Sequence, residues 1–159
     1  MGFDAHRLVP GRELVLGGVK IPFALGLLGH SDADVLTHCV MDAVLGACAL
    51  GDIGRHFPDT DEAYKGASSI LLLAEVRKKA AAAGFTAGNV DAVIMAEQPK
   101  LAPYFDAMRA EIALALGLSK ERVSLKATTT EGLGFTGRGE GMAAQAVVLM
   151  EETDGGAGI

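Results

Sequence analysis

Three stretches with apolar side chains at helical spacing, each followed by a glycine, alternate along the chain with β-branched stretches. The predicted helices cover residues 31–51, 69–83 and 104–116, and glycine readily takes the backbone conformation that ends a helix. Ser31 opens the first of these as a capping-box-like start with Asp34. The predicted extended segments are 3–8, 13–16, 19–21, 90–96, 123–129 and 142–150.

This alternation predicts an α/β chain with α+β character. We expect a mixed sheet of about four to five strands with three helices on one face. The other face also carries apolar side chains, so we expect it to be buried by oligomerisation through the sheets. Residues 1–150 form the expected single domain, and residues 151–159 are expected to be a disordered tail.

Composition narrows the class of protein further. Half of the residues are hydrophobic but only 5% are aromatic, so the core must be built from small aliphatic side chains and Met. The formal net charge of -6 argues against a general nucleic-acid binder, which needs a basic surface to neutralise phosphates. No apolar run approaches the ~18 residues of a membrane helix, and the start lacks a signal segment.

Cys39 and Cys48 lie in one predicted helix, too far apart along it to form a disulfide with each other. Two buried free thiols are typical of a reducing compartment. We therefore expect a soluble, cytoplasmic protein.

Asp4 and His6 stand two residues apart in the first extended segment, so their side chains point to the same face. A catalytic zinc site needs three protein ligands and one open position, so this pair could begin such a site or simply be polar and exposed. The third ligand would be His30, His38 or His56, and spacing alone leaves this open. His38 equally fits a core histidine, and His30, just before a helix start, suits an anion better than a metal.

Two loops carry polar side chains that could bind a ligand. In residues 52–61, three Asp carboxylates could bind hydroxyls or hold Mg²⁺ through water, or they could merely solvate a turn. Residues 126–141 carry three consecutive threonines, Glu131 and Arg138 among glycines, and could wrap a diphosphate with its Mg²⁺ or form a flexible hairpin. Their G-x-G-x-x-G pattern does not indicate a dinucleotide site, because no helix and further parallel strand follow it.

Residues 96–103 leave a predicted strand and contain Lys100 between two prolines. Their backbone could clasp a flat ring while Lys100 approaches a phosphate. The segment also fits an ordinary strand-to-helix connection.

Taken together and in order, five segments resemble the signatures of the 2-C-methyl-D-erythritol 2,4-cyclodiphosphate synthase family: GFDAH, GHSDADVLTH, GDIGRHFPDTD, AEQPK and KATTTEGLGFTGRGEG. The resemblance covers residues 2 to about 150. It implies a homotrimer whose sheets pack around the threefold axis, with active sites between neighbouring subunits. It also implies a cytidine-diphosphate-linked substrate, 4-diphosphocytidyl-2-C-methyl-D-erythritol 2-phosphate, which is cyclised with release of CMP.

The same resemblance implies roles for individual residues. One Zn²⁺ per subunit would be held by Asp4, His6 and His38, and Mg²⁺ or Mn²⁺ at the substrate diphosphate by Glu131. His30, Asp52 and Thr129 would take part in catalysis. Those three, together with Asp4, His6 and Glu131, would also bind substrate, as would Ser31, Gly54, Phe57, Asp59, Asp61, Ala96, Pro99, Lys100, Leu101, Ala102, Ala127, Thr128, Phe135 and Arg138.

Two positions depart from the family pattern. Members usually carry a few residues before the segment that here begins at Gly2, and some have Glu where this chain has Gln145. Two other functions use the same residues: a zinc phosphoesterase with Asp52 as the base for water, and a non-catalytic trimeric sensor of nucleotides or isoprenoid diphosphates.

Overall fold

The computed structural model describes residues 1–153 and contains one five-stranded sheet in the order β4-β1-β7-β5-β6. Its strands are β1 (Gly2–Pro10), β4 (Leu25–Leu27), β5 (Phe85–Met95), β6 (Val123–Thr128) and β7 (Gly141–Glu152). β5 and β6 pair in parallel, and the other neighbours pair antiparallel, which confirms the predicted mixed sheet. A separate hairpin joins β2 (Leu14–Leu16) to β3 (Val19–Ile21).

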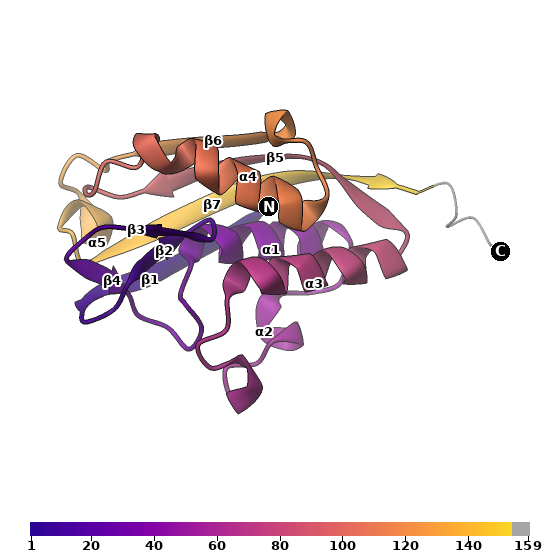
Figure 1. Cartoon of the computed structure of the whole chain (residues 1–159), viewed down its shortest axis with the longest axis horizontal. Helices are drawn as coiled ribbons and strands as arrows, with labels where there is room; N and C mark the ends of the chain where they lie inside the picture. The colour runs from indigo at the N-terminus through magenta and orange to yellow at the C-terminus, as the bar shows by residue number, and fades with distance from the viewer. Residues whose placement is uncertain (154–159) are drawn as a thin grey trace.

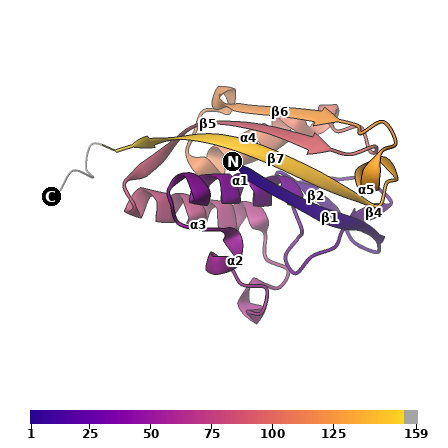
Figure 2. The same cartoon turned by 180° about the vertical axis from the view of Figure 1, so that it is seen from behind.

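The three long helices are α1 (Val35–Ala47), α3 (Ser69–Ala82) and α4 (Phe105–Leu116), as predicted. They lie on one side of the sheet (Figures 1 and 2). α1 packs on β1 and β7, α4 packs on β6, and α3 lies between α1 and α4. Short helices are α2 (Ile53–His56), α5 (Gly134–Gly137) and the 3₁₀ turns η1 (Glu62–Tyr64), η2 (Ala102–Tyr104) and η3 (Lys120–Arg122).

The start of α1 differs from the prediction. Ala33 has a φ of 57°, which no helical residue adopts, so Ser31 cannot open the helix. The N-cap is Asp34, whose carboxylate accepts the Thr37 N–H at 3.0 Å. The same buried carboxylate accepts the N–H groups of Gly17 and Gly18 at 2.9 and 2.8 Å, so it also ties the β2–β3 hairpin to α1.

Other boundaries also differ from the sequence prediction. α1 ends at Ala47, before Gly51, and β5 begins five residues earlier than expected, at Phe85. The loops 52–61 and 126–141 contain the short helices α2 and α5, and β4 was not predicted. β7 continues to Glu152, so the expected tail, residues 151–159, was predicted to begin two residues too early. Residues 154–159 lie outside the described residues.

β1 lies unusually close to α1 at Gly2. A Cβ at this position would overlap the carbonyl oxygen of Cys39 and lie 2.7 Å from the backbone nitrogen of Ala43. Only glycine fits between the strand and the helix here. The contact brings the helix-facing side chains of β1, those of residues 4 and 6, next to α1.

The sheet face opposite the long helices carries exposed apolar side chains. Phe3 on β1 and Val147 and Leu149 on β7 are 58%, 55% and 56% exposed. Figure 2 views the molecule from this side, with β1, β7, β5 and β6 in front of α4. We call this the bare sheet face. No helix among residues 1–153 is long and apolar enough to cross a bilayer.

The predicted free thiols are confirmed. Cys39 and Cys48 are both buried and unbonded. Burial raises the pKa of both thiols, so neither is a reactive thiolate.

Candidate metal centre and active site

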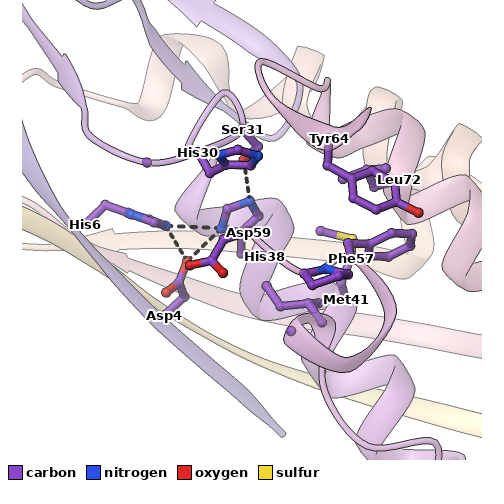
Figure 3. Close-up of a pocket in the computed structure, with 14 residues that line it drawn as sticks. Asp4, His6, His30, Ser31, His38, Met41, Phe57, Asp59, Tyr64 and Leu72 are labelled. Carbon is purple, nitrogen blue, oxygen red and sulfur yellow. Dashed lines mark hydrogen bonds and ion pairs between the residues drawn. The ribbon is translucent and has the colours of Figure 1, made fainter. Parts of the chain in front are cut away.

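Asp4 and His6 on β1 meet His38 on α1 at one point (Figure 3). His6 Nε2 lies 2.9 Å from Asp4 Oδ2, and His38 Nδ1 lies 2.9 Å from the same oxygen. The two ring nitrogens are 3.1 Å apart. The predicted convergence of the strand pair with a helix histidine is therefore present, and the histidine is His38.

These three atoms fit a tetrahedral metal. Bonds of about 2.0–2.1 Å from a zinc ion place neighbouring ligand atoms roughly 3.3–3.4 Å apart. The three distances of 2.9, 2.9 and 3.1 Å are only slightly shorter, so a small outward movement would admit an ion. Two imidazole nitrogens and one carboxylate oxygen are also a donor set that zinc commonly uses.

Hydrogen bonding prepares His6 as a ligand. Its Nδ1 lies 2.9 Å from the carbonyl oxygen of Leu28 and must donate to it, because a carbonyl can only accept. In the neutral ring the lone pair is then on Nε2, the atom that faces Asp4.

The electrostatics of Asp4 and His6 favour opposite charges on these two side chains. Burial raises the pKa of Asp4, but close contact with the His38 and His6 rings, whose protonated forms attract the carboxylate, outweighs burial and holds that pKa well below its ordinary value. Burial lowers the pKa of His6, but the carboxylate of Asp4 and the Leu28 carbonyl together raise it above its ordinary value. The site therefore concentrates negative charge at one carboxylate oxygen, where a cation can replace a proton.

The three side chains open into a pocket of about 450 Å³. Its lining includes most of the residues expected near the substrate phosphate and sugar: Asp4, His6, His30, Ser31, His38, Gly54, Phe57 and Asp59. Figure 3 shows His30 and Ser31 above His38, with Asp59 and Phe57 from the loop that follows α1. The pocket is thus large enough for a small phosphorylated molecule.

Several lining residues were not predicted, and they are mainly apolar. They are Gly29, Met41, Ile53, Pro58, Tyr64 and Leu72. The rings of Phe57 and Tyr64 meet edge to face with centroids 5.4 Å apart and form one wall. Met41 follows His38 by three residues, so the helical repeat could have placed it on the same face of α1.

Two acidic residues of the same loop lie outside the pocket lining. The Asp52 carboxylate caps α2 by accepting the Arg55 N–H at 3.0 Å. The Asp61 carboxylate caps η1 by accepting the Ala63 N–H at 2.9 Å, and its carbonyl lies 3.2 Å from His30 Nε2. Both carboxylates are exposed, and their predicted contacts with substrate remain predictions.

The residues predicted to bind cytosine and diphosphate form a second group, at the carboxyl ends of β5 and β6. The Ala96 N–H donates to the Thr128 carbonyl at 3.0 Å, and the Thr130 N–H donates to Glu97 Oε1 at 2.9 Å. These bonds hold the segments 96–102 and 127–131 together. The second group comprises Ala96, Pro99, Lys100, Leu101, Ala102, Ala127, Thr128, Thr129 and Glu131.

Most side chains of the second group are exposed. The Thr129 hydroxyl donates to Glu131 Oε1 at 2.9 Å. Phe135 is exposed on α5, and Arg138 pairs with Glu140 at 2.8 Å beside a separate pocket of about 290 Å³. None of the residues 96–102 or 127–138 lines the pocket at Asp4.

The sheet register explains this separation. Asp4, Ala144, Ile94 and Ala127 lie in one row across β1, β7, β5 and β6. Three strand spacings put Ala127 about 14 Å from Asp4. Ala144 and Ile94 between them are fully buried, so no path joins the two groups along this row within one chain.

Comparisons with known proteins agree with this geometry. The model of the YgbB family matches residues 1–151. The 2-C-methyl-D-erythritol 2,4-cyclodiphosphate synthase of Moorella thermoacetica is 63% identical over 158 residues, which cover 99% of this chain and 97% of that protein.

Two solved structures share the fold. The bifunctional IspDF from Campylobacter jejuni superposes with a TM-score of 0.92 at 47% identity, over 96% of this chain and 42% of that longer one. A CDP-bound 2C-methyl-D-erythritol-2,4-cyclodiphosphate synthase superposes with a TM-score of 0.86 at 38% identity, over 94% of this chain and 97% of that one. The chain therefore belongs to the YgbB family, the family of the 2-C-methyl-D-erythritol 2,4-cyclodiphosphate synthases.

Proposed function

We propose that this protein is a phosphorus–oxygen lyase of the non-mevalonate isoprenoid pathway. It converts 4-diphosphocytidyl-2-C-methyl-D-erythritol 2-phosphate to 2-C-methyl-D-erythritol 2,4-cyclodiphosphate and CMP. The observation that carries the proposal is the cluster of Asp4, His6 and His38 at the pocket, in a chain that matches this synthase family over nearly its whole length.

The substrate brings its own nucleophile. An oxygen of the 2-phosphate attacks the β-phosphorus, the bond from that phosphorus to the bridging oxygen breaks, and CMP leaves with the bridging oxygen and its electron pair. No side-chain nucleophile is required. The protein has instead to hold two anionic groups together and stabilise the charge that develops between them.

We assign the first metal site to Asp4, His6 and His38. A Zn²⁺ ion bound there supplies positive charge that orients and polarises a substrate phosphate. His30 and Ser31, at the same pocket, would donate hydrogen bonds to the phosphate oxygens. The methylerythritol part would lie along the remaining side of the loop, against Asp52, Gly54, Phe57, Asp59 and Asp61.

We assign the nucleotide end of the substrate to the second group. Ala96, Pro99, Lys100, Leu101, Ala102 and Ala127 would enclose the cytosine. The Thr128 and Thr129 hydroxyls would donate to the diphosphate, with Thr129 at the transferring phosphorus. The Glu131 carboxylate would hold Mg²⁺ or Mn²⁺, which prefer oxygen ligands, and Phe135 and Arg138 would contact the substrate from α5 and its end.

We infer that the two groups complete each other between copies of the chain. Within one chain, a substrate laid along the row that joins the two groups, about 14 Å long, would have to cross the fully buried side chains of Ala144 and Ile94. The bare sheet face supplies an apolar surface for association. We therefore propose a homotrimer assembled through the sheets, with an active site at each subunit boundary.

We place the enzyme in the cytoplasm, with neither nucleic acid nor membrane as a partner. The two free buried thiols are typical of a reducing compartment. The net charge of -6 opposes binding to a nucleic-acid backbone.

Product analysis tests the proposal directly. Purified protein with Zn²⁺ and Mg²⁺ is incubated with the diphosphocytidyl substrate, and the products are identified by ³¹P NMR. We expect equal amounts of cyclodiphosphate and CMP, loss of both after chelation of the metals, and recovery when the metals are restored. An uncyclised bisphosphate would identify a phosphoesterase instead, and binding without CMP release would identify a sensor.

A further inference from the structure

His38 has a second ring nitrogen, Nε2, and its nearest hydrogen-bond partner is not part of the proposed substrate site. Nε2 lies 2.9 Å from the hydroxyl of Ser69, the first residue of α3. Ser69 is fully buried and does not line the pocket. Its hydroxyl donates a hydrogen bond to the carboxylate of Asp32, on the turn before α1.

The direction of these bonds follows from the acceptor at the far end. An ionised carboxylate can only accept, so the Ser69 hydroxyl gives its one proton to Asp32. The Ser69 oxygen is then left as an acceptor toward His38. Nε2 of His38 must therefore be the nitrogen that carries the proton.

Backbone groups fix the carboxylate in place. Asp32 Oδ2 accepts the Ser69 N–H at 3.0 Å, and Asp32 Oδ1 accepts the Asp34 N–H at 3.2 Å. The Ser31 oxygen also lies 3.2 Å from Nε2, but Ser31 lines the pocket and is partly exposed. The shorter and buried contact is the one through Ser69.

Two acceptors compete for the single proton of the neutral His38 ring. Asp4 Oδ2 lies 2.9 Å from Nδ1, and Ser69 Oγ lies 2.9 Å from Nε2. A proton on Nδ1 would satisfy Asp4 and block the nitrogen that a metal needs. A proton on Nε2 leaves the Nδ1 lone pair free.

We propose that Asp32 and Ser69 are positioning residues that hold the His38 proton on Nε2 and so present Nδ1 to a metal ion. The inference rests on the proposed metal site and extends it into α3 and the turn before α1. Partners of this kind typically change metal affinity by about 10–100-fold when they are removed.

We call the hydrogen-bonded series Asp32, Ser69 and His38 the relay. Ser69→Ala and Asp32→Asn each remove one of its two hydrogen bonds. Alanine removes the acceptor for Nε2. An asparagine that still accepts the Ser69 N–H turns its amide donor toward the Ser69 oxygen, which frees the serine proton to point at His38. In both variants we expect the proton to move to Nδ1. Ser68→Ala is the matched control, because Ser68 precedes α3 and its side chain makes no cap hydrogen bond.

Two readouts are needed. The ¹⁵N chemical shifts of the His38 ring in the metal-free protein, at a pH where the ring is neutral, report the tautomer. Competition with a chromophoric chelator reports the affinity for Zn²⁺, which we expect to fall about 10–100-fold in Ser69→Ala and Asp32→Asn and to stay unchanged in Ser68→Ala. Circular dichroism confirms folding, and Asp32→Asn still tests the relay if Ser69→Ala does not fold.

Wild-type tautomer and wild-type zinc affinity in either folded variant would overturn the relay while leaving the metal site intact. If the unsubstituted protein binds no Zn²⁺, the proposed metal site is wrong. The tautomer comparison then decides the relay by itself.

Discussion

At the scale of single residues, His38 is the one proposed metal ligand that lies on α1, while Asp4 and His6 lie on β1. Replacing it by alanine leaves Asp4 and His6, and two ligands do not hold a zinc ion at a site of this kind. We expect His38→Ala to lose bound zinc and to release CMP roughly a hundredfold more slowly or worse. Metal analysis of the purified variant and a CMP assay measure the two effects.

His56→Ala is the control for this prediction. His56 lies outside the pocket lining, with Nε2 2.9 Å from the Leu50 carbonyl, so its loss should leave the zinc content unchanged. One zinc per chain in His38→Ala would show that the ion is held elsewhere.

The sequence predicted part of this cluster by itself. The spacing of Asp4 and His6 on a strand placed them on one face, because strand side chains alternate. It did not choose among His30, His38 and His56, since the distance from a helix to a strand depends on packing that spacing does not encode. The family resemblance selected His38. Neither residue spacing nor the family resemblance indicated Ser69 and Asp32, because their proposed role depends on hydrogen bonds between segments 37 residues apart.

At the scale of elements, the contact between β1 and α1 sets the distance from Asp4 and His6, the proposed ligands on the strand, to His38. Gly2→Ala would force a Cβ into the backbone of α1. We expect a loss of about 1–3 kcal/mol in the free energy of unfolding, typical of overpacking, together with weaker zinc binding. Urea denaturation and a chelator titration measure these two quantities.

The matched control is Gly46, which lies in α1, the helix that Gly2 contacts. A Cβ at Gly46 meets nothing within 4 Å, so Gly46→Ala should raise the free energy of unfolding by about 0.5–1 kcal/mol. If Gly2→Ala is as stable as the unsubstituted protein and binds zinc equally well, the close approach does not position the ligands.

Element types were easier to predict than element ends. The helical repeat identified all three long helices because each buries an apolar stripe. The capping pattern at Ser31 misplaced the start of α1, because Asp34 caps the helix instead and also binds the β2–β3 hairpin, a tertiary contact. The strand β4 has three residues, too few for an alternating pattern to show.

At the scale of the whole molecule, the bare sheet face should be buried between subunits. Val147 is 55% exposed there, and its strand partner is Asp91, which pairs with Lys126 at 2.7 Å. A charge at this position remains solvated in a single subunit but would be desolvated in an assembly. We expect Val147→Lys to turn a trimer into folded monomers, as measured by light scattering during size-exclusion chromatography.

Leu114→Lys is the control on the helical side. Leu114 is 76% exposed on α4, away from the bare sheet face, so this charge should leave the assembly intact. Dissociation by both variants, or by neither, would contradict assembly through the sheets. The need to cover this face could be predicted from the pattern of apolar strands, but the partner's orientation could not.

The row from Asp4 to Ala127 means that every chain would belong to two reaction centres, donating ligands to one and a nucleotide cradle to the next. Two variants that are inactive for different reasons should then restore activity when they are combined in one trimer. His38→Ala and Glu131→Gln subunits, each inactive alone, would on random mixing rebuild about a quarter of the centres, since a centre draws its two halves from different chains. Activity that returns when the two proteins are unfolded and refolded together, and stays absent when each is refolded separately, would be the mark of this shared construction.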